Sequence, residues 1–458
     1  MHPSARVEQR QRQQQVKHAV ASTDSVSFFN LLTSPQLLEV TEAQLPEHRE
    51  RLYPPTVTLS MFMMQALNAD SSCQRAVNDW SAQRLQDGLS APGVSTGAYC
   101  KARERLPQAM VSALVRHTGE CVSALAPQAW GWRGRSVKLL DGTTVSMPDT
   151  AANQARYPQS SRQAVGVGFP LARMAAVICL STGAVCDAAM GSYKGKGGSE
   201  LALLRQLYQA FRPGDIALGD ALYCNYFLIV ALQQRGVDVL FEQQGGRITD
   251  FRRGERLGQR DHRVYWPRPR RPEWMTQAQY DALPPHLALR ETQVAGRVLV
   301  TTLLDHRQVA KPALSALYQR RWQVELDLRN IKVTLGMDIL RCRSPAMNEK
   351  QLWVTLLAYN VIRLLMAQAA LQANRQPRQL SFKHTLQLWT CWVVRGLLDD
   401  PSHTDCLFRY IASRTVGNRA GRVEPRVRKR RPKAFPLLQI PRAQARAQLR
   451  ATQRYAAY

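Results

Sequence analysis

Between residues 136 and 241 the sequence alternates short apolar runs with amphipathic runs, and this alternation restricts the fold more than any other feature. Short apolar runs bounded by Gly, Pro, Ser or Thr are typical of strands, and apolar residues at helical spacing are typical of helices. The sequence predicts strands at 136–140, 171–180 and 184–191, a helix at 199–211, a strand ending at Gly219, a helix at 222–234 and a strand at 237–241. We therefore expect an α/β fold.

Two aspartates follow predicted strands. Asp141 opens the triplet Asp-Gly-Thr, and Asp220 ends the pair Gly-Asp. A side chain that leaves the carboxyl end of a strand in an α/β sheet points into the crevice where ligands gather. Taken singly, each residue is more simply explained as an ordinary turn or helix-capping aspartate. The two motifs gain weight only in combination with a third acid.

That third acid lies in the run ALYQRRWQVELDLRNIKVTLG, in which Tyr318, Arg321, Glu325 and Lys332 are spaced as 0, 3, 7 and 14. In a continuous α-helix the four side chains project within an arc of about 60°. A carboxylate flanked by two cations suits a metal-bound phosphodiester, because the Glu can hold a divalent cation while Arg and Lys hold phosphate oxygens. The alternative is the solvated charged face of an amphipathic helix.

The spacing Tyr-x2-Arg-x3-Glu-x6-Lys resembles the signature helix of the IS4 family of bacterial DDE transposases, with all four positions matched. The resemblance implies an RNase H-like core, a mixed sheet flanked by helices. It implies that Asp141, Asp220 and Glu325 are the catalytic residues and bind two Mg²⁺ (or Mn²⁺) ions. It also implies that three residues of the helix contact DNA, namely Tyr318, Arg321 and Lys332.

The function implied is that of a transposase, which cuts insertion-sequence ends and joins them to target DNA by two-metal phosphoryl transfer. The expected partners are the inverted-repeat DNA of the transposon ends, the target DNA and a second copy of the chain in a synaptic homodimer. Two other functions stay open. One is an RNase H-like nuclease or resolvase without strand transfer, and the other is a non-catalytic domesticated DNA-binding protein, which a lost carboxylate would mark.

The interval between Asp220 and Glu325 is longer than a minimal core needs. Residues 242–297 are rich in Gly, Pro and Arg and contain strand-like fragments. The resembled family carries a β-rich insertion here, and some members use an aromatic residue in it to hold a flipped base. Trp266 and Trp274 are the candidates, since stacking on an unpaired base is worth about 1–3 kcal/mol. The alternative is that both are packing residues.

The charge balance favours a nucleic-acid partner. The net charge is +28, from 62 Lys and Arg against 34 Asp and Glu, and such an excess favours polyanions through counterion release. Between Arg414 and Lys433 nine Lys and Arg face only Glu424. Such a run is often a solvated tail, but it also resembles the basic end of many family members. We expect contacts to DNA phosphates from five of its residues, Arg426, Arg428, Lys429, Arg430 and Arg431.

Three parts are predicted along the chain. Residues 1–130 form a helical region, with a basic cluster at Lys101, Arg103 and Arg105, that binds DNA or simply caps the core. Residues 131–375 form the catalytic core, and residues 376–458 form a helical segment and basic tail. The N-terminus lacks an apolar secretory segment, and Asn360 and Arg363 interrupt the apolar run 352–373. We therefore expect a buried helix there, no membrane span and a cytoplasmic protein, nucleoid-associated when bound to DNA.

The nine cysteines are scattered, without a Cys-x-x-Cys pair. This pattern predicts neither a zinc site nor a disulfide framework.

Overall fold

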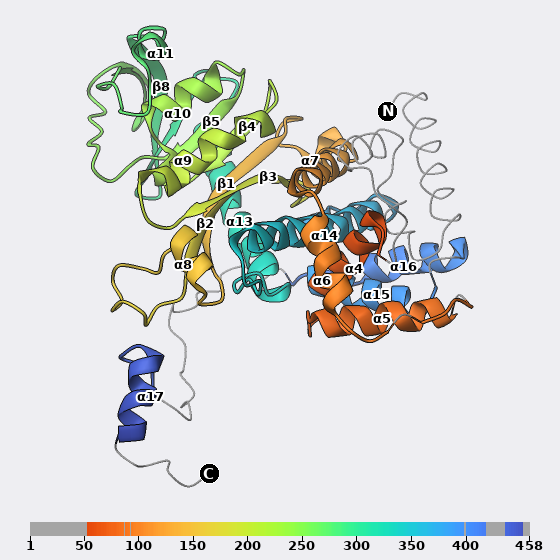
Figure 1. Ribbon diagram of the computed structural model, residues 1–458. Helices are drawn as coiled ribbons and strands as arrows, with labels where there is room; N and C mark the ends of the chain where they lie inside the picture. The colour runs from red at the N-terminus through yellow and green to blue at the C-terminus, as the bar shows by residue number, and fades with distance from the viewer. Residues whose placement is uncertain (1–52, 87, 92, 398–399, 418–435, 452–458) are drawn as a thin grey trace.

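The computed structural model describes residues 53–451 except 87, 92, 398–399 and 418–435 (Figure 1). Its centre is a nine-stranded mixed sheet with the strand order β3-β2-β1-β4-β5-β9-β8-β7-β6. The five strands of the predicted core are β1 (Val137–Ser146), β2 (Leu171–Cys179), β3 (Val185–Ser192), β4 (Ile216–Gly219) and β5 (Asp238–Glu242). The first three pair antiparallel, and β4 and β5 then add in parallel to β1. This is the order of an RNase H-like sheet, as expected.

The predicted insertion continues the same sheet. It contains β6 (Glu255–Gly258), β7 (Asp261–Pro267), β8 (His286–Val294) and the short helix α11 (Gln277–Asp281). The chain returns through β9 (Arg297–Thr301), which pairs antiparallel with both β5 and β8. The insertion is therefore β-rich, and it lengthens the core sheet by hydrogen bonding to its edge.

Helices cover both faces of the sheet because its strands carry apolar side chains on both sides. Leu139 and Leu140 of β1 belong to two different hydrophobic clusters, as the alternation along a strand requires. One face packs against α9 (Glu200–Leu204) and α10 (Tyr226–Gln233). The other face packs against four helices, α7 (Gln108–Ala124), α12 (Lys311–Gln319), α13 (Gln323–Arg329) and α14 (Pro345–Gln372).

The central helix α14 lies between the sheet and the N-terminal helices (Figure 1). Among the described residues it is the one helix long and apolar enough to cross a membrane, yet 94% of its most apolar window is buried inside the protein. The side chain of Asn360 forms hydrogen bonds to the backbone of two neighbouring elements. Its Nδ2 donates to the carbonyls of Val115 and Val185, and its Oδ1 accepts from Val185 N at 2.8 Å. The polar residues in this run thus join α14 to α7 and β3.

The N-terminal helices do not form a separate core. They are α4 (Pro55–Leu67), α5 (Cys73–Gln86), α6 (Gly97–Arg105) and α7. A small cluster that includes Met61, Val77 and Tyr99 joins the first three, but other residues of α4 share the largest cluster with α7, α14 and the sheet. Hydrophobic packing is therefore continuous across the boundary expected at residue 130.

After α14 the chain forms α15 (Phe382–Val394) and α16 (Pro401–Ser413), which pack against it. The last described helix, α17 (Arg442–Ala451), stands apart from the main body in Figure 1. The five basic residues expected to contact DNA at 426–431 lie outside the described residues.

Candidate active site

Asp141 and Asp220 lie at equivalent positions along two neighbouring parallel strands, Asp141 inside β1 and Asp220 directly after the end of β4. The pairing of β1 with β4 runs as far as Leu139 opposite Leu218, and each aspartate comes two residues later. Asp141 does not end its strand, as the sequence had suggested, because β1 continues to Ser146 in pairing with β2. The two aspartates therefore flank the point at which β1 and β4 separate.

The electrostatics agree with this placement. Burial raises the pKa of Asp141 to about 6, the negative charge of Asp220 adds to the increase, and Arg321 opposes it. Asp141 Oδ1 accepts a bond from its neighbour Gly142 N at 2.8 Å. Asp220 caps the short helical turn η4 (Ala221–Tyr223), where its Oδ1 accepts from Leu222 N at 2.9 Å. The charges of Asp220 and Arg321 thus both influence the ionisation of Asp141 near the end of β4.

The helix of the third acid is less regular than its spacing suggested. The α-helix α12 passes into a 3₁₀ turn, η5 (Arg320–Trp322), then into α13, and then into a π-helical turn, η6 (Asn330–Thr334). These turns differ from the α-helix in residues per turn. The four residues of the predicted stripe therefore do not follow one uniform helical face.

Their partners show where each side chain points. Tyr318 OH donates to Glu242 Oε2 at 2.7 Å, at the end of β5. Lys332 Nζ donates to Thr143 Oγ1 at 2.9 Å, two residues beyond Asp141. Both side chains thus reach the region where the acids lie, Tyr318 at the end of β5 and Lys332 at β1 beside Asp141.

Arg321 connects Glu325 with the aspartates. Its Nη2 atom is 3.5 Å from Glu325 Oε1, and its charge also acts on Asp141. Across the described part of the chain, no three His, Cys, Asp or Glu side chains are close enough to hold one metal ion. The register of β1 and β4 places Asp141 and Asp220 side by side, and Glu325 contacts Arg321, whose charge acts on Asp141. All three acids offer carboxylate oxygens, which are the ligands that Mg²⁺ and Mn²⁺ prefer.

A buried ion cluster that the sequence did not suggest fixes the orientation of α13. Asp327 is fully buried and accepts bonds from Arg363 of α14, from Tyr359 OH at 3.1 Å and from Arg378. Burial of so many charged groups is tolerated because each one is paired. Only the ordinary Glu-x-Asp spacing of 325 and 327 marks this residue in the sequence.

A fourth acid near the aspartates was also missed. Glu200, the first residue of α9, lies against Gly142, so that a Cβ at that glycine would be 2.3 Å from Glu200 Cδ. Its charge adds to the raised pKa of Asp141, and burial raises its own pKa. In the sequence Glu200 lies at the start of the helix predicted at 199–211, and in the structure Ser199 caps that helix.

The two tryptophans of the insertion have different surroundings. Trp266 is 4% exposed, its Nε1 donates to Glu291 Oε1 at 2.7 Å, and the guanidinium of Arg247 lies 3.7 Å from its ring centre. A ring covered in this way is a packing residue. Trp274 is 48% exposed, with Arg205 over its ring, so we keep Trp274 alone as the stacking candidate.

The three residues of the basic cluster expected on α6 differ in exposure. Lys101 and Arg105 are exposed, but Arg103 is 5% exposed. Its guanidinium lies 3.9 Å from the ring centre of Phe62, and its Nη1 is 2.8 Å from Cys73 Sγ. Arg103 therefore joins helices and is not placed to contact DNA.

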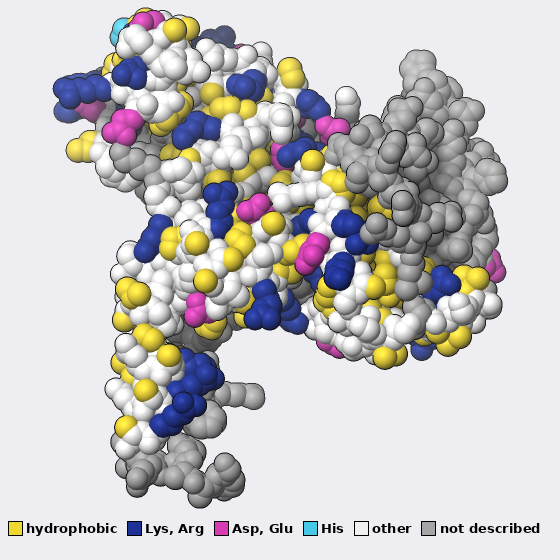
Figure 2. Space-filling model, in the orientation of Figure 1, with side chains coloured by type: hydrophobic (Ala, Val, Ile, Leu, Met, Phe, Trp, Pro, Cys, Tyr) yellow, Lys and Arg dark blue, Asp and Glu magenta, His cyan; other side chains and the backbone are white. Residues whose placement is uncertain are grey.

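The exposed basic residues of α17 were also missed. Arg442, Arg446 and Arg450 recur at every fourth position and are exposed, so they share one helical face. Figure 2 shows Lys and Arg side chains gathered along one side of this helix. The face adds to the basic surface expected for a partner with phosphate groups.

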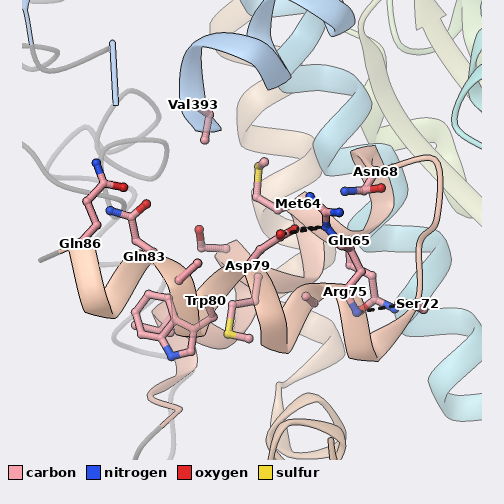
Figure 3. Close-up of a pocket in the computed structure, with 15 residues that line it drawn as sticks. Met64, Gln65, Asn68, Ser72, Arg75, Asp79, Trp80, Gln83, Gln86 and Val393 are labelled. Carbon is pink, nitrogen blue, oxygen red and sulfur yellow. Dashed lines mark hydrogen bonds and ion pairs between the residues drawn. The ribbon is translucent and has the colours of Figure 1, made fainter. Parts of the chain in front are cut away.

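A cavity of about 190 Å³ lies away from the acids, between α4, α5 and α15 (Figure 3). Met64 and Trp80 line it together with Val393, and the ion pair of Arg75 with Asp79 lies at its wall. None of the candidate catalytic residues reaches this cavity.

An RNase H-like sheet with two aspartates where β1 and β4 separate, and a glutamate on a later helix, defines the DDE class of phosphoryl-transfer enzymes. Comparison with known proteins agrees. The family model described as "Transposase DDE domain" matches residues 132–361. The chain is 27% identical over 438 residues to the transposase InsG for insertion sequence element IS4 of Escherichia coli (strain K12), over 90% of this chain and 95% of that protein. The chain belongs to the IS4 family of DDE transposases.

Among solved structures, a piggyBac transposase in a synaptic complex with hairpin DNA aligns with 89% of this chain and 86% of its own. Its TM-score is 0.40 and its sequence identity is 10%.

Proposed function

We propose that this transposase cuts the ends of its own insertion sequence and joins them to target DNA, in the bacterial cytoplasm and with Asp141, Asp220 and Glu325 as its catalytic acids. The observation that carries the proposal is the equivalent position of Asp141 and Asp220 beyond the last paired residues of β1 and β4. Both aspartates then face one phosphodiester at the separation of the strands. The known relatives' activity supports the same reaction.

Asp141, Asp220 and Glu325 would together hold two divalent ions, Mg²⁺ or Mn²⁺. The donor set fits in its chemistry, because all three acids offer the hard carboxylate oxygens that such ions prefer. When bound, such ions activate the attacking oxygen and neutralise charge on the phosphate and the leaving oxygen. Glu325 has to exchange its contact with Arg321 for this role.

The neighbouring cations would hold the DNA end. Arg321 is freed for a phosphate oxygen when Glu325 turns away, and its planar fork suits two oxygens at once. Lys332, fixed by Thr143, supplies a second positive charge beside Asp141. Tyr318 is held by Glu242 and would orient the DNA from the end of β5. None of these groups has to exchange a proton.

More distant basic residues would bind the DNA backbone without reading its sequence. They include the exposed face of α17 and the five residues Arg426, Arg428, Lys429, Arg430 and Arg431. Synapsis of two ends requires two active sites, so we propose a homodimer in the complex with DNA.

The decisive experiment uses Glu325→Gln, which keeps the size of the side chain and removes its charge. We expect the variant to bind a labelled end fragment with wild-type affinity and to give no cleavage in Mg²⁺. The control is Glu104→Gln, at an exposed residue of α6. Cleavage at the wild-type rate by Glu325→Gln would contradict the assignment.

Strand transfer is tested separately. A pre-cut end with a free 3′ hydroxyl is incubated with a supercoiled target, and the joined product is resolved on a gel. A transposase converts the target into joined species, whereas an RNase H-like nuclease releases only cut DNA.

A further inference from the structure

The chain between η6 and α14 runs beside the last residue of β1. Leu340 N donates to Ser146 O at 2.8 Å, and Ser146 N donates to Asp338 O at 3.0 Å. Ser146 comes five residues after Asp141 on the same strand, which corresponds to about 17 Å along β1. The segment 338–344 is therefore attached to the strand of Asp141, at a fixed distance from it.

Two fully buried asparagines hold the backbone of this segment at Cys342. Asn348 of α14 donates to Cys342 O at 2.9 Å and accepts from Cys342 N at 3.0 Å. Asn153 of α8 (Ala151–Arg156) donates to the same carbonyl at 3.2 Å and accepts from Asn348 at 3.1 Å. Apolar side chains could join the two helices without the desolvation of two amides. What the amides add is a fixed backbone at Cys342.

Arg341 and Arg343 lie on either side of this fixed residue, and both are exposed. Cys342 itself points inward, where its Sγ is 3.3 Å from Gln351 Oε1 and 3.4 Å from Arg103 Nη2. Neighbouring side chains of an extended chain alternate in direction, so the two arginines leave the segment on its outer side, about 7 Å apart. Two guanidinium groups at this spacing can reach the same DNA strand.

Both arginines keep donors for a ligand. Within the described part of the chain the guanidinium of Arg343 has no partner, and Thr150 holds only its carbonyl oxygen, at 2.9 Å. Arg341 Nη1 donates to Asp70 O at 3.0 Å, which uses one of its five N–H groups. By contrast, the exposed Arg252 of the insertion pairs with a neighbouring aspartate. A free guanidinium on a fixed backbone loses less conformational entropy when it binds.

Helix α6 adds further positive charge next to this segment. Arg103 of α6 contacts Cys342, and its carbonyl oxygen accepts from Lys350 Nζ of α14 at 3.0 Å. Lys101 and Arg105 of the same helix are exposed. The cations of α6 and of the segment 338–344 therefore belong to one connected part of the protein.

We propose that Arg341 and Arg343 bind the phosphate backbone of the terminal inverted repeat, about five base pairs inward from the bond that is cut. The proposal rests on the proposed function, since it adds a second contact to the same DNA end. The separation of about 17 Å along β1 equals about five steps of 3.4 Å along a DNA strand. The inner side follows because this DNA stays bound between cutting and joining, whereas the flanking DNA is released.

The test uses the full-length protein and fluorescent duplexes of the insertion-sequence end, each with one phosphate replaced by a neutral methylphosphonate. With the unmodified duplex, Arg343→Gln should make the slope of log affinity against log salt concentration shallower by about 1. A methylphosphonate about five base pairs inward should weaken binding of the wild type. It should not weaken binding of Arg343→Gln any further, because that contact is already lost.

Arg341→Gln should show the same loss of effect at a neighbouring phosphate. Arg409→Gln, at an exposed arginine of α16, is the matched control and should respond to every methylphosphonate as the wild type does. If Arg343→Gln binds the unmodified duplex like the wild type, or if each methylphosphonate weakens both proteins by the same factor, the proposal is overturned.

Cleavage by Glu325→Gln in Mg²⁺ shows which proposal has failed. If one methylphosphonate loses its effect in Arg343→Gln but Glu325→Gln still cuts DNA, the surface is correct and the catalytic assignment is wrong. If Glu325→Gln is inactive and no methylphosphonate loses its effect in Arg343→Gln, only the surface is wrong.

Discussion

Asp327 and Arg378 form a buried ion pair in which Asp327 Oδ2 lies 2.7 Å from Arg378 Nη2. Asp327 follows Glu325 by two residues, so the two side chains leave α13 about 200° apart. One carboxylate is therefore directed into the protein, where Arg363 also holds it, and the other is partly exposed and contacts Arg321. The interior pair sets the rotation of the helix that carries Glu325.

Replacement of Asp327 should therefore damage both stability and catalysis. Asp327→Asn leaves two buried guanidinium groups without a countercharge, which costs about 3–5 kcal/mol. We expect the urea midpoint to fall accordingly and DNA cleavage to fall even where the protein remains folded. Asp338→Asn, at an exposed aspartate, is the control. Equal stability of the two variants would show that the buried cluster does not anchor α13.

The raised pKa of Asp141 predicts how stability depends on pH without metal. Between its ordinary value of 3.8 and about 6 the folded protein binds more protons at this residue than the unfolded chain. The ionised carboxylate therefore lowers stability as the pH rises through that range, with the full effect above about 6.

Asp141→Asn should then be more stable than the wild type at pH 8 in EDTA, by about 1–3 kcal/mol. The gain should disappear below about pH 4, where both states of the wild type are protonated. Urea unfolding at the two pH values measures it. A gain that is the same at both would mean that the amide, not the lost charge, causes it.

Lys332 should contribute to DNA affinity through charge rather than through stability. Lys332→Gln loses one phosphate contact, so the slope of log affinity against log salt concentration should become shallower by about 1. Lys383→Gln, at an exposed lysine of α15, should keep the wild-type slope. Titration of a fluorescent end fragment at several salt concentrations measures both. Identical slopes for the two variants would remove Lys332 from the DNA interface.

Substitution of the two tryptophans of the insertion should have different effects, one on DNA binding and the other on stability. Trp274→Ala should weaken binding of an end fragment with an unpaired terminal base by about 1–3 kcal/mol and leave stability nearly unchanged. Trp266→Ala should lower stability by about 3–5 kcal/mol, because its ring is buried. Fluorescence of 2-aminopurine at the unpaired position reports stacking. An unchanged signal with Trp274→Ala would exclude stacking on this residue.

The sequence predicted the order of strands and helices in the core well, because each element has its own apolar periodicity. It misplaced the end of β1, since Asp141-Gly142-Thr143 has the composition of a turn. The structure shows why: the glycine makes room for Glu200, a residue distant in sequence. A local sequence pattern does not predict such contacts between elements that are distant in the sequence.

The helix of Glu325 illustrates the same limit. Its spacing correctly selected residues at the edge of the sheet, but periodicity did not reveal the 3₁₀ and π turns that redirect Tyr318 and Lys332. The burial of Trp266 likewise depends on Glu291 and Arg247, which no short motif connects. Composition identifies such residues as candidates, and packing decides between them.

The backbone pairing of β9 with β5 has a mechanical consequence. Since the inserted strands share a hydrogen-bonded ladder with the core, no hinge separates them from the strands that carry the aspartates. A DNA end bound by the inserted strands would therefore keep a fixed position relative to the strands that carry the aspartates. Accurate cleavage would then not depend on a domain closure.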